Sequence, residues 1–265
     1  MSSYPERIVC LTEETTETLY MLGEESRIVG ISGFTVRPPR ARREKPRVSA
    51  FTSAKMDRIL GLRPDLVLGF SDLQADIAAE LVRSGIAVHV FNQRSVAGIL
   101  QMIRLLGGMV GAGEKAGELA DRLQAGLDAE CTRAASLPRR PRVYFEEWDT
   151  PQISAIRWVS ELVGIAGGDD CFPELARQSL GKNRIIADPA DVVRRAPEII
   201  IGSWCGKKFR PGRVAERNGW ENVPAVANGH VYEVKSALIL QPGPAALTDG
   251  LQALSRIVRR WADSL

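Results

Sequence analysis

One segment decides the fold: it runs Glu-Lys-Ala-Gly-Glu-Leu-Ala-Asp-Arg-Leu from Glu114 to Leu123 and continues to Ser136. Glycines at 111 and 113 precede it and Pro138 follows it, which are start and stop signals for a helix. Its apolar residues recur at steps of three and four, at Ala116, Leu119, Leu123, Leu127, Cys131 and Ala134. At about 1.5 Å per residue the helix would span about 34 Å, the diameter of a small domain. The periodicity fits either an ordinary surface helix or a strut, and the similar sequences on its two sides favour a strut.

The composition is that of a globular protein with room for one large core or two small ones. The 265 residues are 45% hydrophobic and 25% charged, and the net charge is only +3. So small a charge gives no reason to expect nucleic-acid binding. Basic residues do cluster between Arg37 and Arg47, a pattern typical of a solvated loop. No stretch approaches about 18 uninterrupted apolar residues, so no membrane-spanning helix is predicted.

The amino terminus and the cysteines bear on the compartment. The first six residues lack the basic start and apolar stretch of a secretory leader, and a strand pattern begins at Arg7. The cysteines, at 10, 131, 171 and 205, form no Cys-x-x-Cys pair, which suits reduced thiols better than disulfides or a zinc site. We therefore expect a cytoplasmic protein for the sequence as written, and a periplasmic one if the natural start lies upstream or a leader was omitted.

The first 112 residues alternate between strand and helix patterns. Strands are predicted over Arg7–Leu11, Arg27–Ser32, Pro64–Gly69 and Ala87–Phe91, and helices up to Leu22 and over Asp57–Leu62, Ile77–Ser84 and Val96–Val110. Thr12, with Thr15 or Thr16, is expected to cap the first helix. Such alternation indicates a parallel sheet with helices on both faces.

The alternation restarts after the long helix. Strands are predicted at Arg142–Phe145 and Val231–Val234, and helices at Trp158–Ala166, Ala190–Arg195 and Ala245–Trp261. The run from Pro197 to Gly202 repeats the order of the run from Pro64 to Gly69: a proline, an acid, three aliphatic residues and a glycine. We predict an α/β fold of two Rossmann-like lobes, residues 1–112 and 138–265, joined by a single long helix at 113–137.

Ligands of open parallel sheets collect at the carboxyl ends of the strands. The residues that follow the predicted strands combine aromatic rings with a few polar groups, the mix expected around a bulky, largely apolar small molecule. The predicted ligand-binding residues are Phe34, Arg37, Phe51, Phe70, Ser71, Glu147, Trp148, Arg157, Trp204 and Gln241.

An enzyme is the alternative, since several carboxylates surround Trp148. A carboxylate beside an apolar ring can have a raised pKa and serve as acid or base. In an extended strand Glu146 and Glu147 point to opposite faces, and we prefer Glu147 for this role. Neither a catalytic cysteine nor a metal site is expected, so the favoured prediction is a non-catalytic binder.

The order of motifs resembles a known family. A strand is followed by the motif Thr-Glu-x-Leu-Tyr-x-Leu-Gly (16–23) and later by the motif Leu-Arg-Pro-Asp-Leu-Val-Leu-Gly (62–69). The long helix comes next. The second lobe follows it and contains the segment Val223–Tyr232 and the motif Gln-Pro-Gly-Pro (241–244). Almost the whole chain is similar to class III periplasmic-type binding proteins, the cobalamin, ferric-siderophore and haem receptors of ABC importers. The cobalamin-binding branch resembles it most.

The resemblance implies two lobes bridged by a long helix, a ligand in a shallow cleft between them, and little closure on binding. We also expect a monomer. The ligand would be cobalamin or another corrinoid, with a ferric siderophore or haem less favoured. It also implies one acidic residue per lobe that docks onto arginines of an ABC permease: Asp57 in the first lobe, and Glu216 or Glu221 in the second. The chain departs from the branch at Phe51, where tryptophan is common, and at Arg37, which replaces an aromatic residue. Arg37 favours a ligand that carries carboxylate or phosphate.

Overall fold

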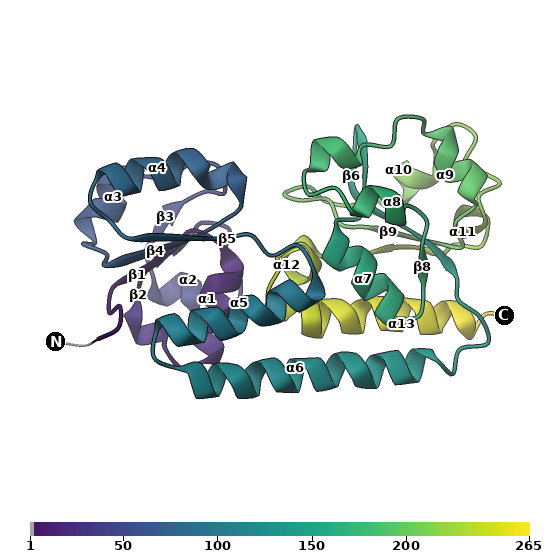
Figure 1. The fold of residues 1–265 in the computed structure, drawn as a ribbon. Coiled ribbons are helices and arrows are strands. Elements are labelled where there is room, and N and C mark those ends of the chain that lie inside the picture. The colour runs from purple at the N-terminus through teal and green to yellow at the C-terminus, as the bar shows by residue number, and fades with distance from the viewer. Residues whose placement is uncertain (1–2) are drawn as a thin grey trace. The chain divides into compact units, whose positions relative to one another are not determined.

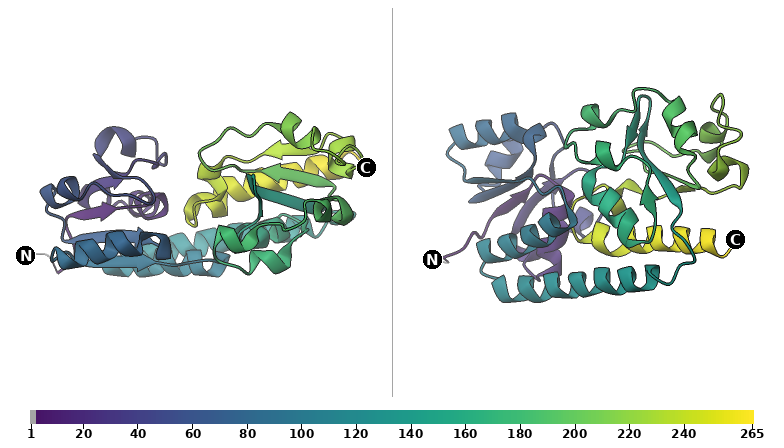
Figure 2. Two further views of the ribbon diagram at one scale, coloured as in Figure 1. Left: turned by 90° about the horizontal axis from the view of Figure 1, so that it is seen from above. Right: turned by 45° about the vertical axis from the view of Figure 1, so that its right-hand side comes forward.

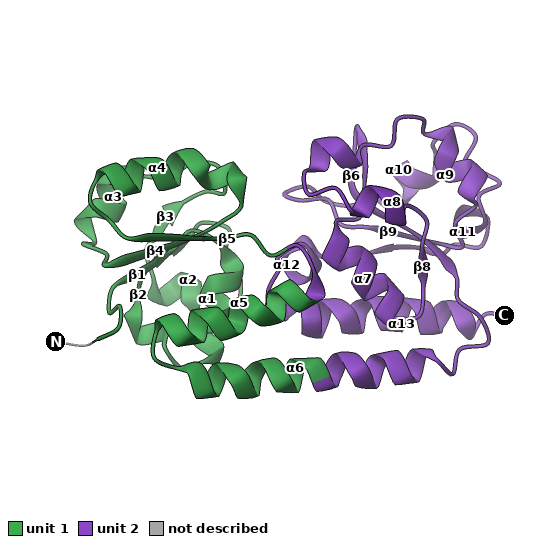
Figure 3. Ribbon diagram, in the orientation of Figure 1, with its two compact units in different colours: residues 1–93, 97–124 green, residues 94–96, 125–265 purple. Residues whose placement is uncertain are grey.

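The computed structural model describes residues 3–265 and divides the chain into two compact units (Figure 3). Unit 1 comprises Met1–Gln93 and Ala97–Gln124, and unit 2 comprises Arg94–Val96 and Ala125–Leu265. Each unit is built on its own β-sheet. Within the described residues, no helix is both long and apolar enough to cross a membrane.

Unit 1 contains a five-stranded, wholly parallel sheet of order β3-β2-β1-β4-β5. Its strands are β1 (Ile8–Cys10), β2 (Ile28–Ser32), β3 (Arg47–Ser49), β4 (Leu66–Phe70) and β5 (Val88–Phe91). The order reverses between β1 and β4, so the carboxyl ends of these two strands form the point where such sheets bind ligands. The edge strand β3 was not predicted, because its three residues lie among charged residues that hide any alternation.

Helices cover both faces of this sheet (Figure 1). They are α1 (Glu13–Met21), α2 (Ala41–Glu44), α3 (Met56–Gly61), α4 (Ala75–Arg83) and α5 (Val96–Met109). Ile59 of α3 and Leu81 of α4 pack onto Val9 and Val67 in the core. Thr12 occupies the N-cap position of α1, but the predicted side-chain cap is wrong: its hydroxyl donates to Glu14 Oε1 at 2.6 Å and caps no amide.

The long helix is α6, Gly113–Ala134. It ends ahead of the predicted 137 because the amide of Leu137 closes a turn onto the carbonyl of Ala134 at 3.1 Å. Its residues up to Gln124 belong to unit 1 and the rest to unit 2. Within unit 2 the helix lies beside α13 (Leu251–Ala262) in Figures 1 and 2, and Arg259 pairs with Glu130 at 3.2 Å.

Unit 2 has a sheet of order β10-β9-β6-β7, with β8 paired to the start of β6. Its strands are β6 (Arg142–Asp149), β7 (Gln152–Ser154), β8 (Asp169–Asp170), β9 (Ile199–Gly202) and β10 (Val231–Glu233). The strand predicted to end at Phe145 continues to Asp149, because β7 folds back and pairs with it in antiparallel register. This hairpin was not predicted; its turn is formed by Thr150 and Pro151.

Seven helices of the described chain surround this second sheet: α7 (Arg157–Ile165), α8 (Pro173–Ala176), α9 (Ala190–Arg195), α10 (Pro211–Ala215), α11 (Pro224–Ala227), α12 (Ser236–Ile239) and α13. Val192, Val214 and Ala225, from α9, α10 and α11, pack with Tyr144 and Ile200 on one face. Helices α7 and α13 lie on the other face (Figure 1). The predicted closing helix begins instead as a π-helical turn, Ala246–Gly250, that leads into α13.

Candidate functional site

The residues predicted in unit 1 lie where its strands end. Phe34 follows β2 with 54% of its surface exposed, and Phe51 follows β3 half-buried. Phe70, the last residue of β4, is buried. Ser71 is also buried, and its hydroxyl accepts a hydrogen bond from the amide of Leu73 at 3.3 Å. The rings of Phe34 and Phe51 therefore have surface that a ligand could contact. Phe70 and Ser71 are buried and belong to the packing at the end of β4.

Gln74, which no sequence pattern marked as part of the site, holds this rim together. The side chain of Gln74 is 1% exposed and lies between the ends of β3 and β4. Its Oε1 accepts from the amide of Phe70 at 2.9 Å, and its Nε2 donates to the carbonyl of Phe51 at 2.8 Å. Both partners are backbone groups, so the rim position of Phe51 depends on a side chain far from it in sequence.

Arg37 lies in the loop after β2 and is partly exposed. Its Nε donates to Glu17 Oε1 at 2.8 Å. The guanidinium group is thus oriented by α1, the helix that follows the central strand β1. An oriented guanidinium group is suited to bidentate recognition of carboxylate or phosphate.

Three carboxylates on the first turns of α1 are buried directly after β1: Glu13, Glu14 and Glu17. Burial, followed by the charges of Glu14 and Glu17, raises the pKa of Glu13 to about 8. Burial likewise raises the pKa of Glu14 to about 7. Sequence analysis missed this cluster, because acidic residues in a first helical turn are ordinary. It lies at the sheet's switch point and would be sensitive to the charge of any ligand.

In unit 2 the predicted alternation of Glu146 and Glu147 is present. Glu146 is fully buried, whereas Glu147 has 23% of its side chain exposed. The guanidinium of Arg184, itself 1% exposed, binds both oxygens of Glu147 at 2.7 and 3.1 Å. Arg184 also donates to the carbonyl of Ser154 in β7. Glu147 is therefore one half of a bidentate ion pair.

Glu146 is the centre of a buried polar cluster. Arg217 binds its two oxygens at 2.6 and 2.9 Å, Tyr144 donates to it at 2.8 Å, and Trp204 Nε1 donates to it at 3.0 Å. Burial, and next the charge of Glu146, raise the pKa of the Tyr144 hydroxyl well above its usual value of 10. The hydroxyl therefore stays protonated and donates. Four donors fully satisfy the carboxylate, as a buried charge requires.

Trp148 and Trp204 are brought together around a lysine. Lys207 Nζ lies 4.9 Å from the ring centroid of Trp148 and 5.0 Å from that of Trp204, within cation–π range. The same ammonium group pairs with Asp149 at 2.6 and 2.7 Å. Trp204 is 3% exposed, yet it lines a cavity of about 340 Å³ with Lys207 and Ser236, beyond the ends of β9 and β10. Trp148 is the more exposed of the two rings.

The remaining predicted residues of unit 2 lie apart from this cavity. Arg157 begins α7, is exposed, and pairs with Glu161 one turn later at 2.8 Å. Gln241 follows α12 and is half-buried. Neither lines the cavity beside Trp204.

All three predicted docking residues are exposed: Asp57 at the start of α3, and Glu216 and Glu221 on either side of Arg217. Their carboxylates make no hydrogen bond or ion pair with any of residues 3–265. The Glu146–Arg217 pair fixes the backbone between Glu216 and Glu221 to the sheet. The carboxylates themselves are available to a cationic partner.

A fold of two α/β units, with aromatic and charged residues at the strand ends, defines a binding protein for small molecules. Residues 8–238 match the family described as periplasmic binding protein, and the chain belongs to that family. The family membership and the α/β fold class predicted from the sequence are thereby confirmed.

The relatives are binding proteins as well. A cobalamin-binding protein of Halobacterium salinarum is 26% identical over 259 residues, which cover 92% of this chain and 67% of that protein. An ABC transporter substrate-binding lipoprotein of Bacillus subtilis is 25% identical over 271 residues, covering 96% and 80%. The periplasmic vitamin B12-binding protein of Vibrio cholerae has the same fold, with a TM-score of 0.77, 22% identity, and coverage of 98% and 99%.

Proposed function

We propose that this chain binds a corrinoid of the cobalamin class and delivers it to an ABC permease. The observation that carries the ligand class is the alignment of a cobalamin-binding protein with 92% of the chain. Each unit has an aromatic ring with exposed surface at a strand end, Phe34 in unit 1 and Trp148 in unit 2, and such rings support binding of an apolar macrocycle. Arg37, oriented by Glu17, supports recognition of a phosphate such as the one in the nucleotide loop of cobalamin.

We propose a binder rather than an enzyme. Arg184 occupies both oxygens of Glu147, the residue that would have to serve as acid or base. This bidentate pair gives Glu147 a structural role, because it ties β6 to the segment that contains Arg184. The three relatives described above carry the names of binding proteins.

The proposed partner is a permease with arginines on its docking surface. Asp57, Glu216 and Glu221 are exposed and unpaired within residues 3–265, as carboxylates at a docking surface should be. One relative is a lipoprotein and another is periplasmic, which supports a site of action on the outer side of the cytoplasmic membrane. Fractionation of the native host tests this location.

The ligand is tested by titrating the purified protein with cyanocobalamin in a calorimeter, with haemin and a ferric siderophore as competitors. We expect one corrinoid per chain. Phe34→Ala and Trp148→Ala should each weaken binding by about 1–3 kcal/mol, the usual effect of truncating an aromatic anchor. Leu105→Ala, at a residue 51% exposed in α5, is the matched control and should change nothing. Tighter binding of haemin or the siderophore, or an aromatic variant that binds like the control, would contradict the proposal.

A further inference from the structure

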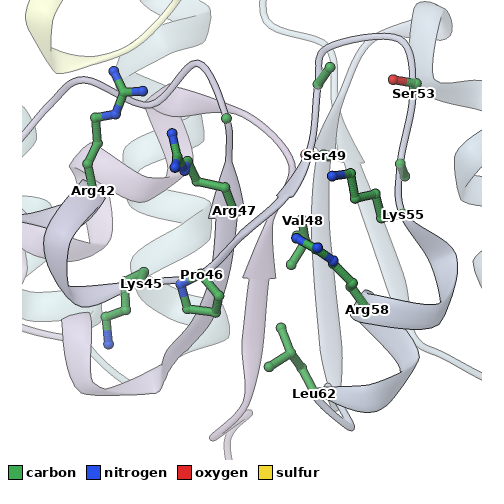
Figure 4. A pocket seen from close by; sticks show the side chains of 13 residues that line it. Arg42, Lys45, Pro46, Arg47, Val48, Ser49, Ser53, Lys55, Arg58 and Leu62 are labelled. Carbon is green, nitrogen blue, oxygen red and sulfur yellow. The ribbon is translucent and has the colours of Figure 1, made fainter.

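A groove with a strongly basic lining lies beside the edge strand β3 of unit 1 (Figure 4). Its volume is about 860 Å³. Five cationic residues line it, with no carboxylate among the lining residues: Arg42, Lys45, Arg47, Lys55 and Arg58. We call it the basic groove. It is lined by none of the residues predicted to bind the main ligand.

Three of the five cations of the basic groove differ from their neighbours in lacking partners among residues 3–265. In the same basic segment Arg37 pairs with Glu17, and Arg40 pairs with Glu25 at 2.7 Å. Arg47, Lys55 and Arg58, by contrast, form no ion pair or side-chain hydrogen bond with any residue in the described part of the chain, 3–265. All three are exposed. Their mutual repulsion is therefore left uncompensated by the protein itself.

A second, independent observation comes from Ser49, which ends β3 and lines the basic groove. The residue is only 8% exposed, and its hydroxyl has no hydrogen-bond partner among the described residues. Its carbonyl is already used, since it accepts from the amide of Gly33 at 2.7 Å. A buried hydroxyl without a partner is unfavourable, and an oxygen-rich ligand in the groove would satisfy it.

We propose that the basic groove binds clustered phosphate groups, carried by a free polyphosphorylated molecule or by a lipid headgroup. Guanidinium groups bind phosphate oxygens bidentately, and two of the three unpaired cations are arginines. Arg47 lies on one side of the groove and Lys55 and Arg58 on the other (Figure 4), so several phosphates can contact more of these cations than one phosphate can. The volume of the groove, about 860 Å³, is large enough for a molecule that carries several phosphate groups.

Calorimetry with sodium tripolyphosphate tests the chemistry. The triple variant Arg47→Gln/Lys55→Gln/Arg58→Gln should bind about 30-fold or more weakly, since each cation supplies a charge-assisted hydrogen bond. Ser49→Ala should weaken binding by about threefold to tenfold. The control is Arg83→Gln/Lys182→Gln/Arg256→Gln, which removes the same charge from exposed positions outside the groove and should bind like the wild type. Circular dichroism establishes that each variant is folded.

Co-sedimentation with phosphatidylcholine vesicles, with and without phosphatidylglycerol, identifies the source of the phosphate. Binding only to tripolyphosphate assigns a soluble ligand, and binding only to the anionic vesicles assigns a lipid headgroup. In either case the triple variant must lose binding and the control must keep it. The proposal is overturned if the wild type binds neither probe, or if the triple variant and the control weaken binding equally.

Discussion

Substitution of Arg217 by methionine tests whether the buried ion pair organises unit 2. Methionine keeps much of the length of the arginine stem but none of its charge. The substitution leaves Glu146, which is fully buried, with Tyr144 and Trp204 as its only donors among residues 3–265. Two hydrogen bonds from neutral donors, at 2.8 and 3.0 Å, then replace four, and the guanidinium group that paired with the carboxylate is lost.

The expected cost is about 3–5 kcal/mol of unfolding free energy, the usual penalty for breaking a buried pair by removing one partner. The penalty arises from the stranded carboxylate rather than from the lost contact. The double variant Glu146→Gln/Arg217→Met removes that charge as well. It should therefore recover most of the loss and lie within about 1–2 kcal/mol of the wild type.

Urea unfolding followed by tryptophan fluorescence measures this effect selectively, because all five tryptophans lie in unit 2. Arg194→Met, at an exposed arginine paired with Asp188, is the control and should leave the unfolding free energy nearly unchanged, because water screens an exposed ion pair. The reasoning fails if Arg217→Met costs no more than the control. It also fails if the double variant is as unstable as the single one, since the stranded charge would then not be the cause.

Two further substitutions test unit 1, followed by circular dichroism. Glu13→Gln should stabilise the protein by about 2–4 kcal/mol at pH 8.5 and have little effect below pH 4.5. The pKa of Glu13 is raised to about 8 in the folded protein, so folding favours the protonated carboxyl. The folded state of the wild type therefore loses stability as the pH rises from about 4.5 to about 8. An equal gain in stability from Glu13→Gln at both pH values would contradict this explanation. Gln74→Ala should cost about 2–4 kcal/mol and weaken cobalamin binding through Phe51, because it removes the buried side chain that links the amide of Phe70 to the carbonyl of Phe51. A variant with unchanged stability and unchanged binding would show that this link does not position Phe51.

Much of the fold could be predicted because its main elements have strong periodic signals. The run from Pro64 to Gly69 and the run from Pro197 to Gly202 each contain three consecutive aliphatic residues, and both form buried parallel strands. The elements that were missed are short. Strand β7 has three residues and exists because it pairs with β6, so its stability comes from a partner rather than from its own sequence.

The candidate site was harder to predict because its polar residues are defined by their partners. Alternation along a strand places Glu146 and Glu147 on opposite faces, but it cannot say that each is neutralised by an arginine. The two partners, Arg217 and Arg184, are 71 and 37 residues away in sequence.

In the basic groove it is the lack of partners that could not be predicted from the sequence. The segment from Arg37 to Arg47 reads as one solvated basic loop, yet the fold divides it into paired and unpaired cations. Arg37 and Arg40 pair with carboxylates on neighbouring elements, whereas Arg47, Lys55 and Arg58 line the basic groove and form no ion pair with any of residues 3–265. Because like charges repel, nothing in the stability of the fold itself favours that second arrangement. An anionic ligand in the basic groove would offset this repulsion, as the proposed phosphate site predicts.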